Sequence, residues 1–316
     1  MIPDRLHKGD MIGIVSPSSF LAKETQGLLS NAIEILKKYD LKVVLAKNAL
    51  AVDKYGVSAG SPEQRASDIN EMFANQNIKC ISCSKGGDTA NGVLELIDYD
   101  LIRKNPKIFS GLSDNTVLIN AIHHKTGLVT FHGTDLKAGN KDEYFDSEYS
   151  HEEFKKRLMD GKIGEINKIS EWKCVRKGKA KGKILGGNIN CMLKLAGTPY
   201  MPDLAGSILL LEGYHLDIKR ITFLFAQLKQ MGVFDKIAGI VVGYVYGFEK
   251  DEQCDKEGNR VYFEDILLEA TKDYPFPILK MQEFGHKCPS TVLPIGCMAE
   301  LDAGQKSFRI LEPCVK

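Results

Sequence analysis

KIFSGLSDNTVL, residues 107–118, predicts a buried strand that turns directly into a helix. Ile108 and Phe109 form the apolar run of the strand, and the glycine that follows interrupts it. Ser113 then stands just before the helix, where a hydroxyl projects from the end of the sheet toward unpaired backbone amides. A nucleophile that faces a developing oxyanion needs this arrangement. The alternative is that Ser113 or Asp114 only caps the helix, because both residue types are frequent caps.

Strand-like and helix-like segments alternate on both sides of this turn. Buried strands are predicted at 11–17, 41–45, 78–83 and 128–131, with helices between them. This alternation favours an α/β architecture, in which helices flank a parallel sheet and ligands bind at the carboxyl ends of its strands. We therefore predict an N-terminal parallel-sheet domain over residues 1–135.

The second half of the chain has a different pattern. Residues 136–183 are polar and charged and predict a linker and loop region, which ends in the basic run 173–183. Residues 184–316 contain short strand-like runs with a few helices and predict a mixed α/β domain. Two domains also agree with the length of 316 residues, which exceeds a comfortable single core.

The composition argues against several classes of protein. The 42 basic and 41 acidic residues leave a net charge of +1, which gives no general attraction to nucleic acid or anionic lipid. No apolar run approaches about 18 residues, and the N-terminus lacks the apolar core of a signal peptide. The eight cysteines are typical of free thiols in a reducing cytoplasm. We expect a cytoplasmic protein with no nucleic-acid or membrane partner, and the sequence leaves a homodimer open.

No group of side chains has convincing metal-ligand spacing. Cys80 and Cys83 have the spacing of a zinc knuckle, but residues three apart in a strand point to opposite faces. His123 and His124 are adjacent on one predicted helix and lie about 100° apart around it, so they cannot hold one metal together. We therefore expect neither a metal nor a cofactor.

Two further residues stand where catalytic groups are usually found. Glu212 follows four apolar residues, and a buried carboxylate is costly without a partner. His286 lies in a loop after another apolar run, where its ring could be that partner. A salt bridge for Glu212 and a surface position for His286 are the alternatives, and His132 is a competing base. The glycines at 86–87 offer backbone amides to a ligand, or form only a tight turn.

Several segments together resemble the LD-carboxypeptidase family of serine peptidases, which includes the microcin C self-immunity peptidases. The resemblance runs nearly from end to end in the family's order. It is carried by KGDMIGIVSP (8–17), GGDTAN (86–91), DYD (98–100), NPK (105–107), GLSDNT (111–116), TG (126–127), GKILGGN (182–188), LEG (211–213), VFD (233–235), GH (285–286) and LPIG (293–296).

This resemblance implies metal-free acyl transfer by a serine. It places the nucleophile at Ser113, the acid at Glu212 and the base at His286, with oxyanion donors at the backbone amides of Asp114 and Gly87. His286 would take the serine proton and later protonate the leaving amine, while Glu212 holds the imidazole in the useful tautomer. Because these residues belong to two predicted domains, we expect the active site in an interdomain cleft.

Two kinds of substrate are compatible with the resemblance. One branch of the family releases terminal D-alanine from murein tetrapeptides during cell-wall recycling, by cleaving an L,D amide bond. The other hydrolyses the amide bond of aminoacyl sulfamoyl or phosphoramidate nucleosides and gives immunity. Segment 86–91 looks like the second branch. The separation of Ser113 and Glu212 in the sequence looks like the first, because the immunity peptidases carry a longer loop before the second domain. That loop length favours the murein peptide. A non-catalytic protein that binds a ligand between two domains is the alternative of another class.

Three residues of the predicted linker are candidate substrate contacts. Trp172 could stack on an adenine, or it could anchor the linker. Arg176 and Lys177 belong to the basic run between the two predicted domains, and a cation is needed to hold the free carboxylate of a leaving residue. We therefore expect Arg176 and Lys177 at the lip of the cleft, unless the run is only a solvated loop.

Overall fold

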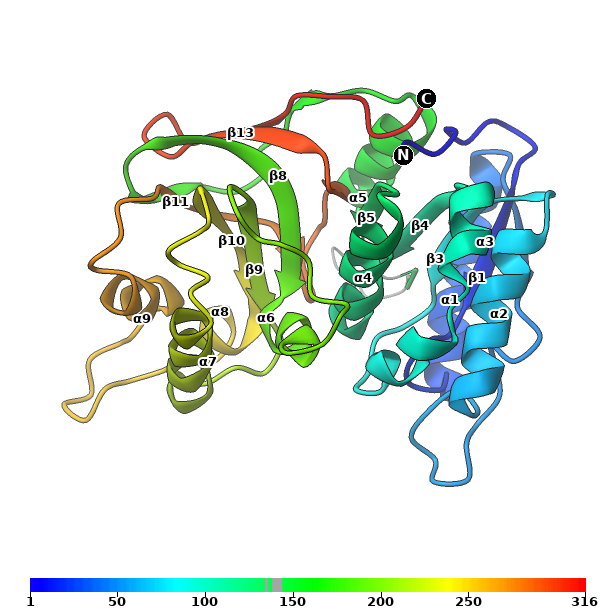
Figure 1. Cartoon of the computed structure of the whole chain (residues 1–316), viewed down its shortest axis with the longest axis horizontal. Helices are drawn as coiled ribbons and strands as arrows, with labels where there is room; N and C mark the ends of the chain where they lie inside the picture. Colours follow the sequence, from blue (N-terminus) through cyan, green and yellow to red (C-terminus); the bar gives the residue numbers. More distant parts are fainter. Residues whose placement is uncertain (134–135, 138–143) are drawn as a thin grey trace.

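The structure is a computed structural model that describes residues 1–133, 136–137 and 144–316. Its strands form two sheets, which Figure 1 shows side by side. The first sheet has the order β12-β5-β4-β3-β1-β2, with bounds Leu293–Ile295, Thr130–His132, Ile108–Gly111, Ile78–Cys83, Met11–Val15 and Lys42–Leu45. Its neighbours pair in parallel, except β12 and β5, which pair antiparallel. The predicted parallel sheet of the N-terminal half is therefore confirmed.

Helices cover both faces of the first sheet because its strands are apolar on both sides. On one face, Ile14 and Ile108 share a core with Leu29 of α1. On the other face, Phe109 stacks on Phe73 of α2, with 5.9 Å between the ring centroids. The helices of this half are α1 (Lys23–Lys38), α2 (Pro62–Ala74), η1 (Ala90–Leu96), α3 (Tyr99–Lys104), η2 (Ser113–Asn115) and α4 (Thr116–Thr126).

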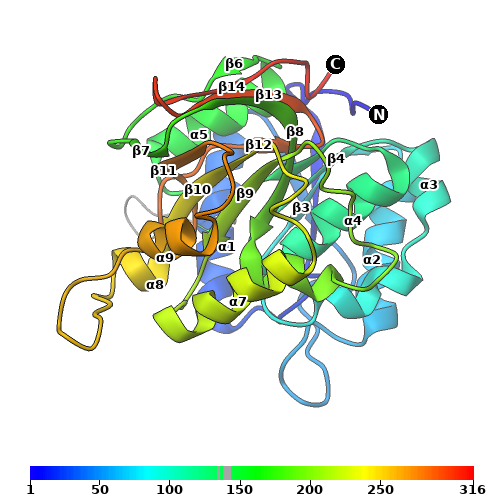
Figure 2. The ribbon, with the colours of Figure 1, turned by 60° about the vertical axis from the view of Figure 1, so that its left-hand side comes forward.

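The second sheet is mixed, as predicted for the C-terminal half. Its order is β6-β14-β13-β8-β9-β10-β11-β7, and its centre from β8 to β11 is parallel. Figure 2 shows β6, β14 and β13 gathered at the top of the view. The strands are β6 (Gly164–Glu165), β7 (Lys173–Arg176), β8 (Lys179–Asn188), β9 (Ile208–Gly213), β10 (Gly239–Val245), β11 (Ile278–Gly285), β13 (Met298–Asp302) and β14 (Ser307–Ile310). The helices are α5 (Glu148–Phe154), the π-helix η3 (Lys155–Met159), α6 (Ile189–Met192), η4 (Leu193–Leu195), α7 (Ile218–Gln230), α8 (Tyr246–Glu249) and α9 (Phe263–Ala270).

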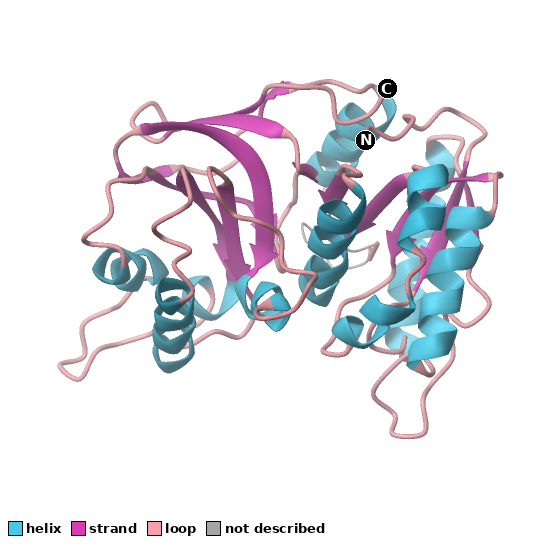
Figure 3. Ribbon diagram, viewed as in Figure 1, coloured by secondary structure: helices cyan, strands magenta, loops and turns pink. Residues whose placement is uncertain are grey.

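The helix α4 joins the two halves (Figure 3). The side-chain amide of Asn120 donates to the carbonyl of Gly186 at 2.9 Å and accepts from its backbone N–H at 3.0 Å. One turn earlier, Thr116 Oγ1 accepts from the backbone N–H of Asn188 at 3.1 Å. The helix that follows Ser113 is therefore bonded directly to β8 of the second sheet.

The basic run 173–183 is not the loop that its charge predicted, because it forms β7 and the beginning of β8. Lysines alternate with small or apolar residues at the beginning of β8. The lysines therefore point to solvent from one face of the sheet, while the residues between them lie on the opposite, more buried face. On the neighbouring strand, acidic side chains pair with them: Lys179 with Asp302 at 2.9 Å and Lys181 with Glu300 at 3.1 Å. Two of the lysines of the run are thus paired with acidic residues of their own sheet.

The chain returns to the first sheet near its C-terminal end. Residues 286–292 connect β11 of the second sheet to β12 of the first. This connection is held at two points, because Thr291 donates its backbone N–H to the carbonyl of Glu283 at 2.7 Å and Ser290 donates its own to Ser150 Oγ at 2.8 Å. No helix among the described residues is long and apolar enough to cross a lipid bilayer.

Candidate active site

Ser113 lies on a strained turn between β4 and α4. Its φ angle is 65°, a left-handed value that is unfavourable for a residue with a side chain and persists only where the surroundings enforce it. One enforcing contact is Gly86, where an added Cβ would lie 2.5 Å from the Cβ of Ser113 and 2.7 Å from its Oγ. The glycine turn predicted to approach a ligand therefore packs against the side chain of Ser113.

Asp114 is fully buried and does not act as a simple helix cap. Its Oδ2 accepts from Ser18 Oγ at 2.6 Å and from the backbone N–H of Ala90 at 2.8 Å. Its Oδ1 accepts from Lys194 Nζ at 2.6 Å, and the same ammonium donates to the carbonyl of Asp88 at 2.9 Å. The carboxylate beside Ser113 thus ties together the loop after β1, the glycine turn and η4 of the second half.

Glu212 and His286 form a buried pair. Glu212 is the last residue but one of β9 and His286 follows β11, so two parallel neighbours of β10 bring the two side chains to one edge of the sheet. Nδ1 of His286 lies 2.7 Å from Oε2 of Glu212, and both residues are almost fully buried. Burial raises the pKa of Glu212, but the charge of His286 and its hydrogen bond outweigh that effect and hold the pKa below its usual range.

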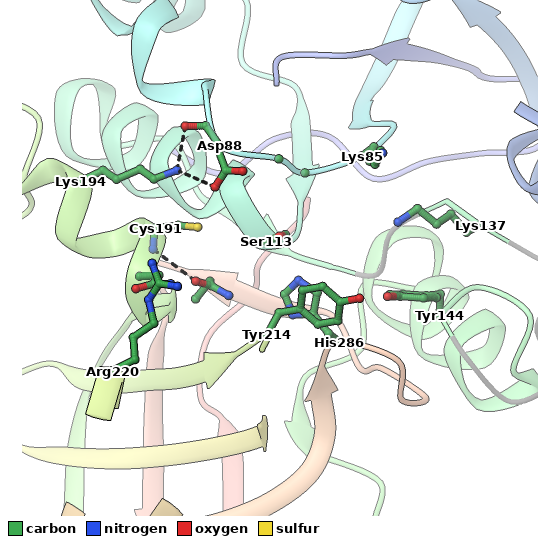
Figure 4. A pocket seen from close by; sticks show the side chains of 14 residues that line it. Lys85, Asp88, Ser113, Lys137, Tyr144, Cys191, Lys194, Tyr214, Arg220 and His286 are labelled. Carbon is green, nitrogen blue, oxygen red and sulfur yellow. Dashed lines mark hydrogen bonds and ion pairs between the residues drawn. The ribbon is translucent and has the colours of Figure 1, made fainter. Parts of the chain in front are cut away.

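Nε2 of His286 is buried and has no hydrogen-bond partner among the described residues. With Nδ1 bonded to Glu212, this nitrogen is the one available to a reacting group. Tyr214 supports the ring from one side, because the two rings stack with 4.8 Å between centroids and 19° between planes. Figure 4 shows Tyr214 over His286 at the floor of a pocket that also contains Ser113.

This pocket has a volume of about 460 Å³ and receives residues from both halves of the chain. Its cationic side chains are Lys85, Lys137, Lys194 and Arg220, and Asp88 is the acidic residue that lines it. The other described residues at its surface are Gly86, Gly87, Ser113, Tyr144, Asn188, Asn190, Cys191, Tyr214 and His286. Cationic side chains therefore outnumber acidic ones among the described residues that line the pocket.

Trp172 does not line this pocket. Its side chain is 2% exposed, and its indole N–H donates to Glu283 Oε2 at 2.8 Å. Glu283 is itself fully buried and also accepts from the backbone N–H groups of residues 169 and 170. The anchoring alternative is therefore correct for Trp172, and its predicted stacking on an adenine is wrong for this structure.

Arg176 and Lys177 also lie away from the pocket. Arg176 ends β7, the edge strand beside β11, and donates to the carbonyl of Thr271 at 2.8 Å and to its Oγ1 at 2.9 Å. Lys177 is exposed in the turn between β7 and β8. The prediction that these two cations form the lip of the cleft is wrong, because the run that carries them is part of the sheet.

The competing base, His132, is buried at the end of β5. Its ring packs edge to face against Phe284, with 5.7 Å between the centroids, and it does not line the pocket. Lys194, Tyr214 and Arg220 are pocket residues that the sequence did not single out. Lys194 and Tyr214 contact partners far along the chain, Asp114 and His286, and no local pattern indicates such contacts. In the described part of the chain, no three metal-ligating side chains are grouped as a metal site.

The arrangement combines a hydroxyl on a strained turn, a histidine with a free nitrogen and a carboxylate that holds the other nitrogen. Family models match both halves of the chain. The model of the LD-carboxypeptidase N-terminal domain matches residues 12–133, and the model of the LD-carboxypeptidase C-terminal domain matches residues 181–301.

Relatives match over almost the full length of the chain. A probable murein peptide carboxypeptidase of Bacillus subtilis (strain 168) is 32% identical over 96% of this chain and 92% of its own. The microcin C7 self-immunity protein MccF of Escherichia coli is 31% identical over 96% of this chain and 94% of its own. The solved structure of MccF in complex with aspartyl sulfamoyl adenosine has a TM-score of 0.89 and 28% identity, and the alignment covers both chains completely. This chain therefore belongs to the LD-carboxypeptidase family of serine peptidases.

Proposed function

We propose that this enzyme is a metal-independent LD-carboxypeptidase that releases the terminal D-alanine of murein tetrapeptides. Ser113 is the nucleophile, His286 the general base and Glu212 the residue that orients and charges the imidazole. The observation that carries the assignment is the 2.7 Å contact between His286 and Glu212 in a pocket lined by Ser113. It leaves Nε2 of His286 as the only ring nitrogen available to Ser113.

The proposed reaction has two steps. His286 removes the proton of Ser113 while Oγ attacks the scissile carbonyl, and the resulting imidazolium is stabilised by the carboxylate of Glu212. The imidazolium then protonates the leaving amine of D-alanine, and water hydrolyses the acyl-enzyme by the same route. The backbone amides of Asp114 and Gly87 are assigned to the oxyanion. This assignment is supported by the close packing of the glycine turn on Ser113.

The charge of the pocket supports a substrate with free carboxylates. Among the described residues that line the pocket, four side chains are cationic and one is acidic, and one of the four, Lys194, is paired with the buried carboxylate of Asp114. A carboxylate that leaves water needs a cation or several N–H donors. The burial of Trp172 adds to this, because the aromatic side chain expected to hold a nucleoside is part of the protein core.

A second candidate is hydrolysis of an aminoacyl sulfamoyl nucleoside. The observation that favours it is the likeness to MccF over both complete chains, including its complex with aspartyl sulfamoyl adenosine. An acidic aminoacyl group would also suit the cationic pocket, so charge alone does not separate the two substrates.

The deciding experiment compares the two substrates with one enzyme preparation. D-Alanine release from a murein tetrapeptide and cleavage of aspartyl sulfamoyl adenosine are followed by chromatography, with Ser113→Ala as the control for contaminating hydrolases. We expect the tetrapeptide to have the higher kcat/KM, and we expect the rate to be unchanged by EDTA. Cleavage of the sulfamoyl nucleoside alone would replace the proposed substrate by the second candidate.

A further inference from the structure

Arg220 is a charged residue of the active-site pocket that the proposed mechanism leaves without a role. It lies in the first turn of α7 and lines the pocket together with Ser113 and His286. Figure 4 shows its guanidinium directed into the pocket, on the side where Lys194 also lies. Its side chain is exposed, and no salt bridge of the described residues includes it.

Helix stability does not explain this position of Arg220. The N-cap is Asp217, whose Oδ1 accepts from the backbone N–H of Arg220 at 2.6 Å, so capping needs only the main chain at residue 220. Lys219 adds a second cation to the same turn, and no acidic residue lies in it. Cations in the first turn of a helix are unfavourable, because the unpaired N–H groups there already carry partial positive charge.

The neighbouring cation is already compensated. Lys194 is 2.6 Å from the buried carboxylate of Asp114 and also donates to the carbonyl of Asp88. On this side of the pocket, Arg220 therefore carries the positive charge that no described acidic side chain neutralises. His286 and Ser113 line the same pocket, so an anion bound by Arg220 would share that pocket with the proposed reacting groups.

We propose that Arg220 binds the free carboxylate of the terminal substrate residue and thereby restricts the enzyme to the last bond of the peptide. The inference rests on the proposed carboxypeptidase function and names the residue that makes it an exopeptidase. A guanidinium presents two parallel N–H donors that match the two oxygens of a carboxylate. The contact exists in the ground state and in the transition state, so its loss raises KM and leaves kcat nearly unchanged.

The test compares Arg220→Gln with the wild type on two peptides. One is a murein tetrapeptide with a free terminal carboxylate, and the other is the same peptide with that carboxylate amidated. For the free acid we expect KM to rise by roughly 10- to 100-fold, the range for losing a hydrogen bond to a charged group. For the amide we expect a much smaller change, so the preference of the enzyme for the free acid should collapse.

Two further variants separate this role from a structural one. Arg220→Lys keeps the charge without the paired donors and should restore part of the preference. Arg260→Gln removes an arginine from an exposed loop outside the pocket and should leave both peptides unaffected. If Arg220→Gln lowers the melting temperature by several degrees, the same comparison is made with Arg220→Lys.

If Arg220→Gln raises KM equally for both peptides, or for neither, the proposed role of Arg220 is wrong. Failure of the proposed function gives a different result, since the wild type would then release neither D-alanine from the free acid nor D-alaninamide from the amide. In that case calorimetry with the free-acid peptide, in the Ser113→Ala background, decides the inference alone. Weaker binding after Arg220→Gln supports it, and binding that is unchanged or absent in both proteins refutes it.

Discussion

Replacing Lys194 by methionine removes one partner of an ion pair that joins the two halves of the molecule. Asp114 belongs to the turn of Ser113, and Lys194 belongs to η4 of the second half. Their charged atoms lie 2.6 Å apart, with the carboxylate fully buried and the lysine side chain 24% exposed. Methionine keeps the length and apolar packing of the lysine stem, so the variant tests the ammonium group.

The expected loss of stability follows from what remains around the carboxylate of Asp114. It keeps its bonds from Ser18 and Ala90 but loses its counter-charge. A hydrogen bond to a charged group contributes about 1.5 to 3 kcal/mol, and breaking a fully buried ion pair costs about 3 to 5 kcal/mol. Because water reaches the lysine, we expect the free energy of unfolding to fall by about 2 to 4 kcal/mol.

Urea denaturation across a pH series is the assay for Lys194→Met. Burial lowers the pKa of Lys194, but its hydrogen bond to Asp114 and the nearby acidic charges outweigh burial, so the pKa is raised. A raised pKa gives stabilisation that is complete below the unfolded value of about 10.4 and is lost as the pH rises through the folded value. The difference between wild type and variant should therefore be constant near neutral pH and shrink in strongly alkaline solution.

A difference below about 0.5 kcal/mol at neutral pH would refute this reasoning, because such a value is typical of an ordinary surface substitution. The double variant Lys194→Met with Asp114→Asn is the matched control. It removes both charges and should be more stable than Lys194→Met alone. Labelling of Ser113 by a fluorophosphonate should also slow in Lys194→Met, since the same ammonium holds the carbonyl of Asp88 at the glycine turn.

Three further predictions concern the buried carboxylates and the proposed triad. Ser113→Ala and His286→Ala should each lower kcat for D-alanine release by about 10⁶, with little further loss in the double variant, whereas Glu212→Ala should cost about 10⁴; near-normal turnover in His286→Ala would defeat the assignment. Because the pKa of Glu212 is depressed, its ionised carboxylate stabilises the fold fully above about pH 4.3, and this stabilisation is lost as the pH falls further. The difference in unfolding free energy between wild type and Glu212→Gln should therefore shrink in acid. A difference that stays constant with pH would contradict the depressed pKa. Trp172→Phe removes the donor to Glu283 and should cost about 1 to 2 kcal/mol of stability; a selective rise in KM for a sulfamoyl nucleoside would instead restore the nucleoside role of Trp172.

The strand-to-helix turn at Ser113 could be predicted from the sequence because its determinants are local. The apolar run, the glycine and the helix period all lie within residues 107–118. Glu212 and His286 could be singled out in the same way, each at the end of an apolar run, and the structure places them in contact. From the residues alone, His286 was one possible partner of Glu212, and the family resemblance selected it, because no local pattern reports a contact across 74 residues.

The errors arose where tertiary context decides the role of a charge. Arg176 and Lys177 lie in a basic run that would be a plausible cationic lip if it were a loop. The run instead pairs with β13, more than 100 residues away, in a sheet, and acidic residues of β13 pair with two of its lysines. The predicted stacking of Trp172 was wrong for a similar reason, since its partner Glu283 is far away in the sequence and is fully buried. Arg220 was missed because nothing around it in the sequence distinguishes it from a surface arginine.

The connection from β11 to β12 has a mechanical consequence for the proposed base. His286 is the first residue of the short span that leaves the second sheet at β11 and enters the first sheet at β12. A shift of one sheet against the other is therefore transmitted along the backbone to the imidazole, while Glu212 moves with the second sheet and Ser113 with the first. The relative placement of Ser113, Glu212 and His286 therefore depends on the relative position of the two sheets. Substitutions that loosen the fastening of this span, such as Ser150→Ala, should slow the chemistry before they measurably weaken the fold.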